Sequence, residues 1–174
     1  IYERTEEGGL MSTLFAATFL DDHVGQIKTD PRVALIELIA NASDAGATSV
    51  KIDWPNDVGQ SITVEDNGIG MTKTEFLSRW QTLSYERRAS LGKEIVLPSD
   101  VAPRPQRSLF GKSGKGRHAS FCFSESYIVE TWRNGLRTKA TVKEVQSSKE
   151  PFEVSILSED KFPGHGTKII VELK

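Results

Sequence analysis

The chain has 174 residues, of which 37% are hydrophobic and 26% charged, and its formal net charge is -2. These values are typical of one globular domain with a sizeable core, and they argue against a chain that binds nucleic acid through bulk positive charge. The single Cys122 excludes an internal disulfide and a cysteine metal cluster, and the apolar runs at 14–20 and 33–40 are too short to span a bilayer.

The domain organisation and the compartment follow from the same properties. One cysteine and no signal-peptide pattern at the start suit a reducing, cytoplasmic setting. Because residue 1 is Ile rather than Met, we expect a fragment of a larger protein. We predict a single domain over residues 1–174, in which residues 1–29 are an N-terminal extension with a short apolar helix at 10–20.

The clearest helix signal starts at Asp30 and ends at Gly46. Asp30 is a favoured capping residue, Pro31 suits the first helical turn, and glycine is common just after a helix ends. The helix is therefore predicted to run to about residue 45. A second helix is predicted over residues 72–85, with Thr72 or Thr74 as its cap.

Strands are predicted where β-branched and aromatic residues alternate with polar ones, namely at 49–54, 61–65, 127–133, 136–142, 152–157 and 167–173. Asn134-Gly135 is typical of a tight hairpin turn. Residues 86–110 contain prolines and show no periodicity, as in functional or disordered loops. The order of elements predicts an α+β fold: a two-layer α/β sandwich whose mostly antiparallel mixed sheet has helices on one face.

The first candidate for chemistry is a polar stripe on the predicted helix at 30–45. Glu37, Asn41 and Asp44 are spaced at i, i+4 and i+7 and share one face. The amide oxygen of Asn41 suits a hard cation such as Mg²⁺, and Glu37 could orient and deprotonate a water for attack on a phosphate. The alternative is an amphipathic helix whose polar face is merely solvated, and the stripe alone leaves that open.

The second candidate is the turn Asp66-Asn67-Gly68-Ile69-Gly70-Met71, which follows a strand. Gly68 and Gly70 let the backbone turn tightly and approach a flat ligand. An Asp66 carboxylate accepts hydrogen bonds only, which matches an exocyclic amine such as that of adenine, and Met71 offers a pliable apolar wall. An ordinary tight turn between two elements would look the same.

The third candidate is the basic, glycine-rich stretch 110–117. The wider segment 86–117 has net charge +5 and leaves -7 for the rest of the chain. Glycines among cations can form a backbone nest for phosphates. The stretch is not a Walker loop, because Gln106 stands where that motif needs glycine. A flexible, solvated glycine loop remains the alternative.

The remaining polar signals are weaker. Thr167 follows Gly164-His165-Gly166 and starts the last predicted strand, where it could bond Asp66 or a water on a bound base. A Gly-Thr pair before a strand is usually only a turn. His23, His118 and His165 have no metal-ligand spacing, and we expect them to be surface bystanders.

Four segments in this order resemble the GHKL ATPase superfamily, which includes DNA gyrase B, the ninety-kilodalton heat-shock chaperones, MutL proteins and sensor histidine kinases. ELIANASDAGA is similar to the asparagine box, DNGIGM to the first glycine box, GKSGKG to the second and GTKIIVEL to the last box. The resemblance covers about residues 30–174 and implies a Bergerat-type α/β sandwich. That fold would hold ATP and Mg²⁺ under a mobile lid, here residues 86–110.

The resemblance also implies roles for individual residues. Glu37 would be the general base, Asn41 the magnesium ligand, and Asp44 and Ala45 would lie near the nucleotide. Asp66 would read the adenine amine, and the base pocket would be completed by Gly68, Gly70, Met71 and Thr167. The phosphates would be wrapped by the second glycine box, namely Gly111, Lys112, Ser113, Gly114, Lys115, Gly116 and Arg117.

Within the superfamily, the motifs are most similar to those of the heat-shock chaperone branch, although the second glycine box is more basic. The resemblance implies an ATPase, slow as an isolated domain, whose turnover drives a conformational or dimerisation cycle. The alternative is a nucleotide-gated binding module with negligible hydrolysis. The expected partners are ATP, ADP and a second copy of the full-length protein, and no membrane is expected.

Overall fold

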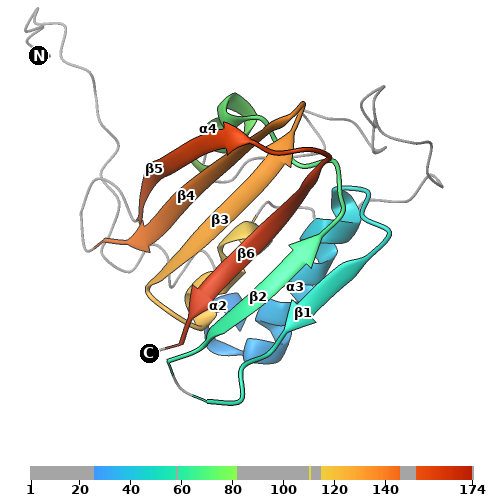
Figure 1. Cartoon of the computed structure of the whole chain (residues 1–174). Helices are drawn as coiled ribbons and strands as arrows, with labels where there is room; N and C mark the ends of the chain where they lie inside the picture. Colours follow the sequence, from blue (N-terminus) through green and yellow to red (C-terminus); the bar gives the residue numbers. More distant parts are fainter. Residues whose placement is uncertain (1–25, 58, 82–109, 111–114, 146–151, 174) are drawn as a thin grey trace, which may run out of the picture.

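The structure is a computed structural model that describes residues 26–57, 59–81, 110, 115–145 and 152–173. Figure 1 shows a six-stranded sheet with α2, α3 and η1 behind it. The elements are α2 (Gln26–Thr29), α3 (Pro31–Asp44), β1 (Val50–Asp53), β2 (Ser61–Asp66), α4 (Lys73–Gln81), the 3-10 helix η1 (Lys115–Cys122), β3 (Ser126–Arg133), β4 (Leu136–Glu144), β5 (Phe152–Lys161) and β6 (Gly166–Glu172). No helix in the described part of the chain has the length and apolar character needed to cross a membrane.

The sheet has the order β1-β2-β6-β3-β4-β5, and each neighbouring pair is antiparallel. The last strand in sequence therefore lies in the middle of the sheet, between β2 and β3. This arrangement confirms the predicted α+β sandwich. It also places the start of β6 beside the end of β2, because Thr167 pairs with Asp66 in the register.

Helix α3 begins and ends where its sequence predicts. The Asp30 carboxylate accepts a hydrogen bond from the backbone N of Arg32 at 2.9 Å, and Pro31 occupies the first turn. The helix ends at the cap Ala45, and the chain then turns through Gly46 with a φ of 72°. Left-handed backbone of this kind costs glycine little, which explains why the helix stops there.

The β3–β4 hairpin also forms as predicted. Asn134 and Gly135 have φ values of 56° and 78°, and positive φ at both central residues is the hallmark of a type I′ turn. Helix α4 is preceded by Thr72, whose hydroxyl accepts from the backbone N of Glu75 at 3.4 Å. Of the two cap candidates, Thr72 is thus the one used.

Three local features differ from the sequence prediction. Strand β5 extends to Lys161 rather than stopping at 157, because β4 holds its polar, exposed end in register through Leu136↔Lys161. No helix was predicted over residues 115–122 or 26–29, where η1 and α2 form. The predicted helix at 10–20, the end of the helix at 72–85, and residues 86–109 lie outside the described residues.

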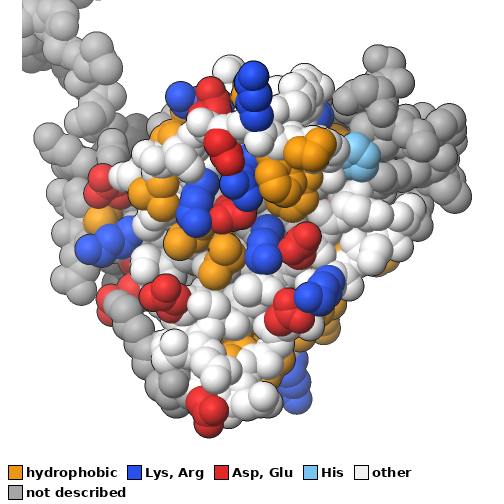
Figure 2. All heavy atoms as spheres, in the orientation of Figure 1, with side chains coloured by type: hydrophobic (Ala, Val, Ile, Leu, Met, Phe, Trp, Pro, Cys, Tyr) orange, Lys and Arg blue, Asp and Glu red, His pale blue; other side chains and the backbone are white. Residues whose placement is uncertain are grey.

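The two faces of the sheet have opposite character. The face toward the helices is apolar, and its strands share one core with α3, α4 and η1 that includes Leu38, Phe76, Phe121, Val129 and Ile169. The open face carries interspersed acidic, basic and apolar side chains (Figure 2). One cross-strand row on that face alternates in charge, with Lys168 bonded to Glu65 at 3.1 Å and Lys139 to Glu130 at 3.0 Å. Burial therefore concentrates on the helix side.

Candidate functional site

A cavity of about 130 Å³ lies on the helix side of the sheet. Its walls come from α3, β2 and the turn after it, the last turn of α4, η1, and β6, so segments far apart in sequence meet there. The lining residues are Leu38, Asn41, Ala42, Ala45, Val64, Asp66, Gly70, Met71, Arg79, Trp80, Arg117, Thr167 and Ile169. The cavity thus has an apolar floor and a few polar groups, which is the usual make-up of a small-molecule site.

Helix α3 contributes one wall. Asn41 and Ala45 line the cavity one turn apart, and Glu37 lies one turn before Asn41. Asp44 is 1% exposed, and its Oδ1 accepts a hydrogen bond from the backbone N of Phe110 at 2.7 Å. At Asp44 the predicted stripe is therefore not solvated, because this carboxylate holds the chain immediately before the second glycine box.

The turn after β2 is anchored to the residues just before β1. Asp66 Oδ1 accepts from the backbone N of Gly68 at 2.7 Å. Asn67 Oδ1 accepts from the backbone N of Thr48 at 2.8 Å and of Ser49 at 2.9 Å, while its amide nitrogen donates to the Thr48 hydroxyl at 2.8 Å. The backbone N of Ile69 donates to Ala45 O at 2.9 Å, so the turn is also tied to the end of α3. Asn67 acts as a scaffold residue for the loop.

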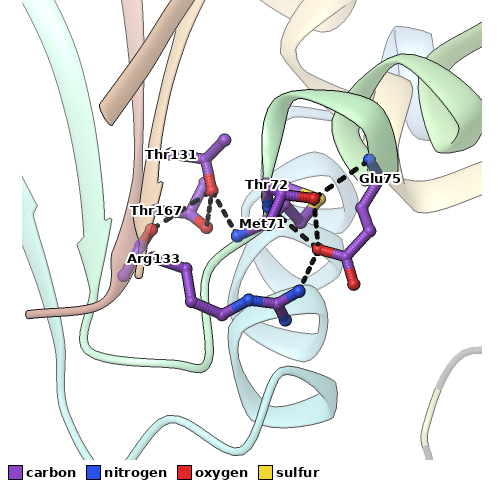
Figure 3. Close-up of polar contacts among 7 residues, drawn as sticks. Met71, Thr72, Glu75, Thr131, Arg133 and Thr167 are labelled. Atoms are coloured by element: carbon purple, nitrogen blue, oxygen red, sulfur yellow. Dashed lines mark hydrogen bonds and ion pairs between the residues drawn. The ribbon is translucent and has the colours of Figure 1, made fainter. Parts of the chain in front are cut away.

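Two further side chains hold the same loop from the other side. The buried Thr131 hydroxyl accepts from the backbone N of Met71 at 2.9 Å and donates to Gly166 O at 3.2 Å (Figure 3). It also lies 3.3 Å from the Thr167 hydroxyl. His165 Nδ1 donates to Gly68 O at 2.6 Å, since a carbonyl oxygen can only accept. The loop is thus preorganised by β3 and by the turn that leads into β6.

The expectation that the histidines are surface bystanders is wrong for two of them. His118 is 1% exposed and contacts two aromatic rings: Phe121 is stacked with its centroid 5.9 Å away, and Phe152 is tilted with its centroid 4.5 Å away. His165 is half-buried and bonded to the glycine loop. Both lie in positions created by the fold, which their sequence neighbours do not reveal, and His23 lies outside the described residues.

The glycines are required by close approach. A Cβ on Gly68 would lie 2.7 Å from Asp66 Oδ1 and 2.8 Å from Ala45 Cβ. Gly70 has a φ of 61°, and a Cβ there would collide with the carbonyl of Trp132. A Cβ on Gly116 would collide with Glu37 Oε2 and lie 3.2 Å from Glu37 Cδ. Gly116 thus packs directly against the carboxylate that the sequence nominates as a base.

The last turn of α4 is fixed to η1 and β3. Trp80 Nε1 donates to the Tyr127 hydroxyl at 3.1 Å, and that hydroxyl donates in turn to Arg117 O at 3.3 Å. The Arg117 guanidinium donates to Arg79 O. Burial raises the pKa of the Tyr127 phenol, partly offset by the hydrogen bond from Trp80, so the hydroxyl stays neutral and keeps this chain of bonds intact.

The first turn of α4 is fixed by charge. Glu75 accepts from the backbone N of Thr72 at 2.8 Å and is ion-paired with Arg133 of β3 (Figure 3). Burial alone would raise the pKa of Glu75, but the hydrogen bonds from Arg133 and Thr72 outweigh it and hold the pKa below its ordinary value. The carboxylate therefore closes a capping box and ties α4 to the sheet.

Many of the residues proposed from the sequence surround the cavity. Those in its lining are Asn41, Ala45, Asp66, Gly70, Met71, Arg117 and Thr167. Gly68 packs under Asp66, while Glu37 and Gly116 form a contact beside the cavity. Lys115 begins η1. Gly111, Lys112, Ser113 and Gly114 lie outside the described residues.

Sequence reasoning missed several residues of the site. Arg79 and Trp80 line the cavity, and Thr131 supports its loop. No motif marks them, because each reaches the site through a contact between distant segments. The one available signal was a tryptophan near the end of an amphipathic helix, which predicts burial but not what it packs against.

The sequence is similar to known proteins over most of its length. Residues 29–167 match the family model for histidine kinase-, DNA gyrase B- and HSP90-like ATPases. The chaperone protein HtpG of Francisella tularensis subsp. holarctica is 30% identical over 142 residues, which are 79% of this chain and 21% of that protein. HtpG of Polaromonas naphthalenivorans is 28% identical over 164 residues, 84% of this chain and 25% of that protein.

The chain thus spans about a fifth to a quarter of the length of the relatives it matches. The matched segment contains α3, the glycine turn, η1 and the start of β6, which together build the cavity. On these grounds the chain belongs to the histidine kinase-, DNA gyrase B- and HSP90-like ATPase family.

Proposed function

We propose that this domain binds ATP with Mg²⁺ in the cavity, hydrolyses it slowly, and drives a conformational or dimerisation cycle of a larger cytoplasmic protein. The observation that carries the proposal is the meeting of Asn41, Asp66 and Arg117 around one cavity. A nucleotide–magnesium complex needs three kinds of group: a hydrogen-bond acceptor for the nucleobase, as in Asp66, an amide oxygen for the cation, as in Asn41, and a guanidinium for a phosphate, as in Arg117.

Asp66 and the loop after it would hold the adenine. One oxygen of Asp66 is engaged by the backbone N of Gly68, which fixes the carboxylate at the cavity wall. A carboxylate has further lone pairs that can accept from the exocyclic amine. Gly70 lets the backbone approach the ring, and Met71 and Thr167 complete the base pocket.

The phosphates would lie toward η1 and the second glycine box, Gly111 to Arg117. Asn41 fits a magnesium ligand, since Mg²⁺ usually takes one or two protein oxygens together with phosphate oxygens and waters. Among the described residues there is no group of three or more His, Cys, Asp or Glu that could hold a metal alone. A single amide oxygen from Asn41 suits an ion that is otherwise held by the phosphates, whose negative charge the ion would neutralise.

Glu37 would act as the general base. In hydrolysis a water oxygen attacks the γ-phosphorus, the bond from that phosphorus to the bridging oxygen breaks, and Glu37 takes the water proton while ADP leaves. Gly116 leaves room for the carboxylate beside the cavity. Asp44 would contribute indirectly, by holding Phe110 and thus the start of the glycine box.

The second candidate function is a nucleotide-gated module that closes or dimerises on ATP with negligible hydrolysis. One observation favours it: Glu37 packs on Gly116 and is not among the residues that line the cavity. A general base that lies outside the cavity would have to move before it could contact a water next to the γ-phosphate.

Binding is tested by calorimetry with ATP and GTP on the wild type, Asp66→Asn and Asp57→Asn. Asp57 lies in an exposed turn, so Asp57→Asn removes the same charge away from the cavity. We expect Asp66→Asn to lower ATP affinity roughly 10- to 100-fold, because an amide can present a donor to the donating amine. Unchanged ATP affinity in Asp66→Asn would contradict the adenine assignment.

Hydrolysis is tested separately with Glu37→Ala and Asn41→Ala, in the full-length protein as well as in this domain. Glu37→Ala should keep ATP bound and lose about 10²–10⁴-fold in rate, which is typical for loss of a general base. Asn41→Ala should lose the magnesium dependence of binding. A wild-type full-length protein that binds ATP without turnover would select the gated-module alternative.

A further inference from the structure

Arg79 is a cation in the cavity wall that the motifs do not account for. It lies in the last turn of α4, is half-buried, and lines the cavity together with Arg117. In the part of the chain that the structure describes, its guanidinium has no ion pair with a carboxylate. A half-buried guanidinium has lost part of its hydration, and an anionic ligand in the cavity would offset that loss.

The backbone that presents Arg79 is held in place. Its carbonyl accepts from the Arg117 guanidinium, which brings the two arginines together although they are far apart in sequence. The next residue, Trp80, is 7% exposed and bonded to Tyr127, which is 2% exposed. Little backbone ordering is therefore left for a ligand to impose at this turn, and binding energy is not spent on it.

The position of Arg79 relative to the base-reading residue also matters. Asp66 and Thr167 come from adjacent strands of the sheet, whereas Arg79 and Arg117 come from α4 and η1. The two arginines that can bind an anion thus lie on different structural elements from the Asp66 carboxylate that can accept a hydrogen bond from an amine. A ligand with a polar base at one end and several negative charges at the other matches this division.

We propose that Arg79 binds the phosphate chain of the nucleotide and, with Arg117, makes the site select nucleoside polyphosphates over nucleosides. This inference rests on the proposed nucleotide site and adds a residue that the sequence motifs do not assign. A planar guanidinium donates two parallel hydrogen bonds to phosphate oxygens, which gives geometric as well as electrostatic selectivity. A nucleoside offers no such acceptor and gains nothing from Arg79.

The test compares ATP and adenosine binding by calorimetry in the wild type, Arg79→Gln and Lys73→Gln. Lys73 is exposed in the first turn of the same helix, so Lys73→Gln removes an equal charge from α4 without touching the cavity. Arg79→Gln should lower ATP affinity roughly 10- to 100-fold and leave adenosine affinity within about 2-fold. Lys73→Gln should change neither by more than about 3-fold.

Salt dependence gives a second readout. Each phosphate contact made by a cation steepens the fall of affinity with ionic strength, so ATP binding by Arg79→Gln should be less salt-sensitive than that of the wild type. Should Arg79→Gln fail to fold by circular dichroism, Arg79→Lys keeps the charge and the alkyl stem. That variant must still bind ATP several-fold more weakly with adenosine affinity unchanged, because it lacks the planar fork.

The outcomes separate this inference from the proposed function. If Arg79→Gln lowers the affinities for ATP and adenosine equally, Arg79 only shapes the cavity. If it does not lower the affinity for ATP, the phosphates lie elsewhere. Either result overturns the inference and leaves the adenine assignment in place. A wild type that binds neither ligand would overturn the proposed function and the inference with it.

Discussion

Gly116→Ala is the substitution that most directly tests the place of Glu37. An alanine Cβ at this position would lie well inside 3.0 Å of Glu37 Oε2, and at 3.2 and 3.3 Å from Glu37 Cδ and Cβ. Gly116 does not have a left-handed φ, so alanine can adopt its backbone without strain. The perturbation is therefore confined to the side chain of Glu37.

The expected magnitude follows from how far the carboxylate must retreat. Ordinary van der Waals contact begins at 3.4 Å, so Oε2 has to withdraw by about 1 Å. Since the atom is at the end of a flexible side chain, this rotation costs only about 0.5–1.5 kcal/mol of stability. A 1 Å misplacement of a catalytic group can cost about 10²-fold in rate, or about 2.7 kcal/mol in the barrier.

The assay is steady-state ATP hydrolysis combined with calorimetric ATP binding, on Gly116→Ala, Glu37→Gln and the double variant. We expect kcat to fall about 10²-fold in Gly116→Ala while ATP affinity changes by less than about 3-fold. In the Glu37→Gln background, Gly116→Ala should add almost no further loss, because the base it displaces is already absent. Fully additive losses in the double variant would refute the reasoning, since Gly116 would then act independently of Glu37.

Three further predictions concern the loop and α4. Thr131→Val should destabilise the fold by about 1–3 kcal/mol in urea unfolding, because the buried backbone N of Met71 loses its acceptor. Thr131→Ser keeps the hydroxyl and should be about as stable as the wild type. Equal stability of the two variants would exclude this role for the hydroxyl. Gly70→Ala should lower the free energy of unfolding by about 2 kcal/mol or more in the same measurement, because the residue has a φ of 61° and its new Cβ would collide with Trp132 O. An unchanged free energy of unfolding would show that the loop relaxes freely. The pKa of Glu75 is lowered in the folded state, so the ionised carboxylate stabilises the fold above its ordinary pKa of 4.5, and this stabilisation is lost as the pH falls through the folded pKa. Thermal unfolding from neutral pH to about pH 3 should therefore show the stability of the wild type falling toward that of Glu75→Gln. A difference in stability that does not change with pH would contradict the ion pair with Arg133.

Local sequence determined the parts of this protein that depend on neighbours along the chain. Asp30 and Gly46 set the ends of α3, because capping and left-handed backbone are properties of single residues. Asn134-Gly135 specified its hairpin for the same reason. Helical periodicity alone placed Glu37 one turn from Asn41, and the loop from Asp66 to Met71 could be recognised by its composition.

Tertiary structure decided which distant segments meet. The insertion of β6 between β2 and β3 places Thr167 beside Asp66 and brings Thr131 under Met71, and nothing in the local sequence of β3 reveals that register. The same holds for Arg79, which enters the cavity because the buried Trp80 is bonded to Tyr127 on β3. Secondary-structure signals have a range of a few residues, whereas these contacts span tens of residues and depend on packing the whole core. For that reason the sequence could nominate Asp66 and its glycine loop, but only the fold could show that Thr131 and His165 hold this loop and that Arg79 lines the same cavity.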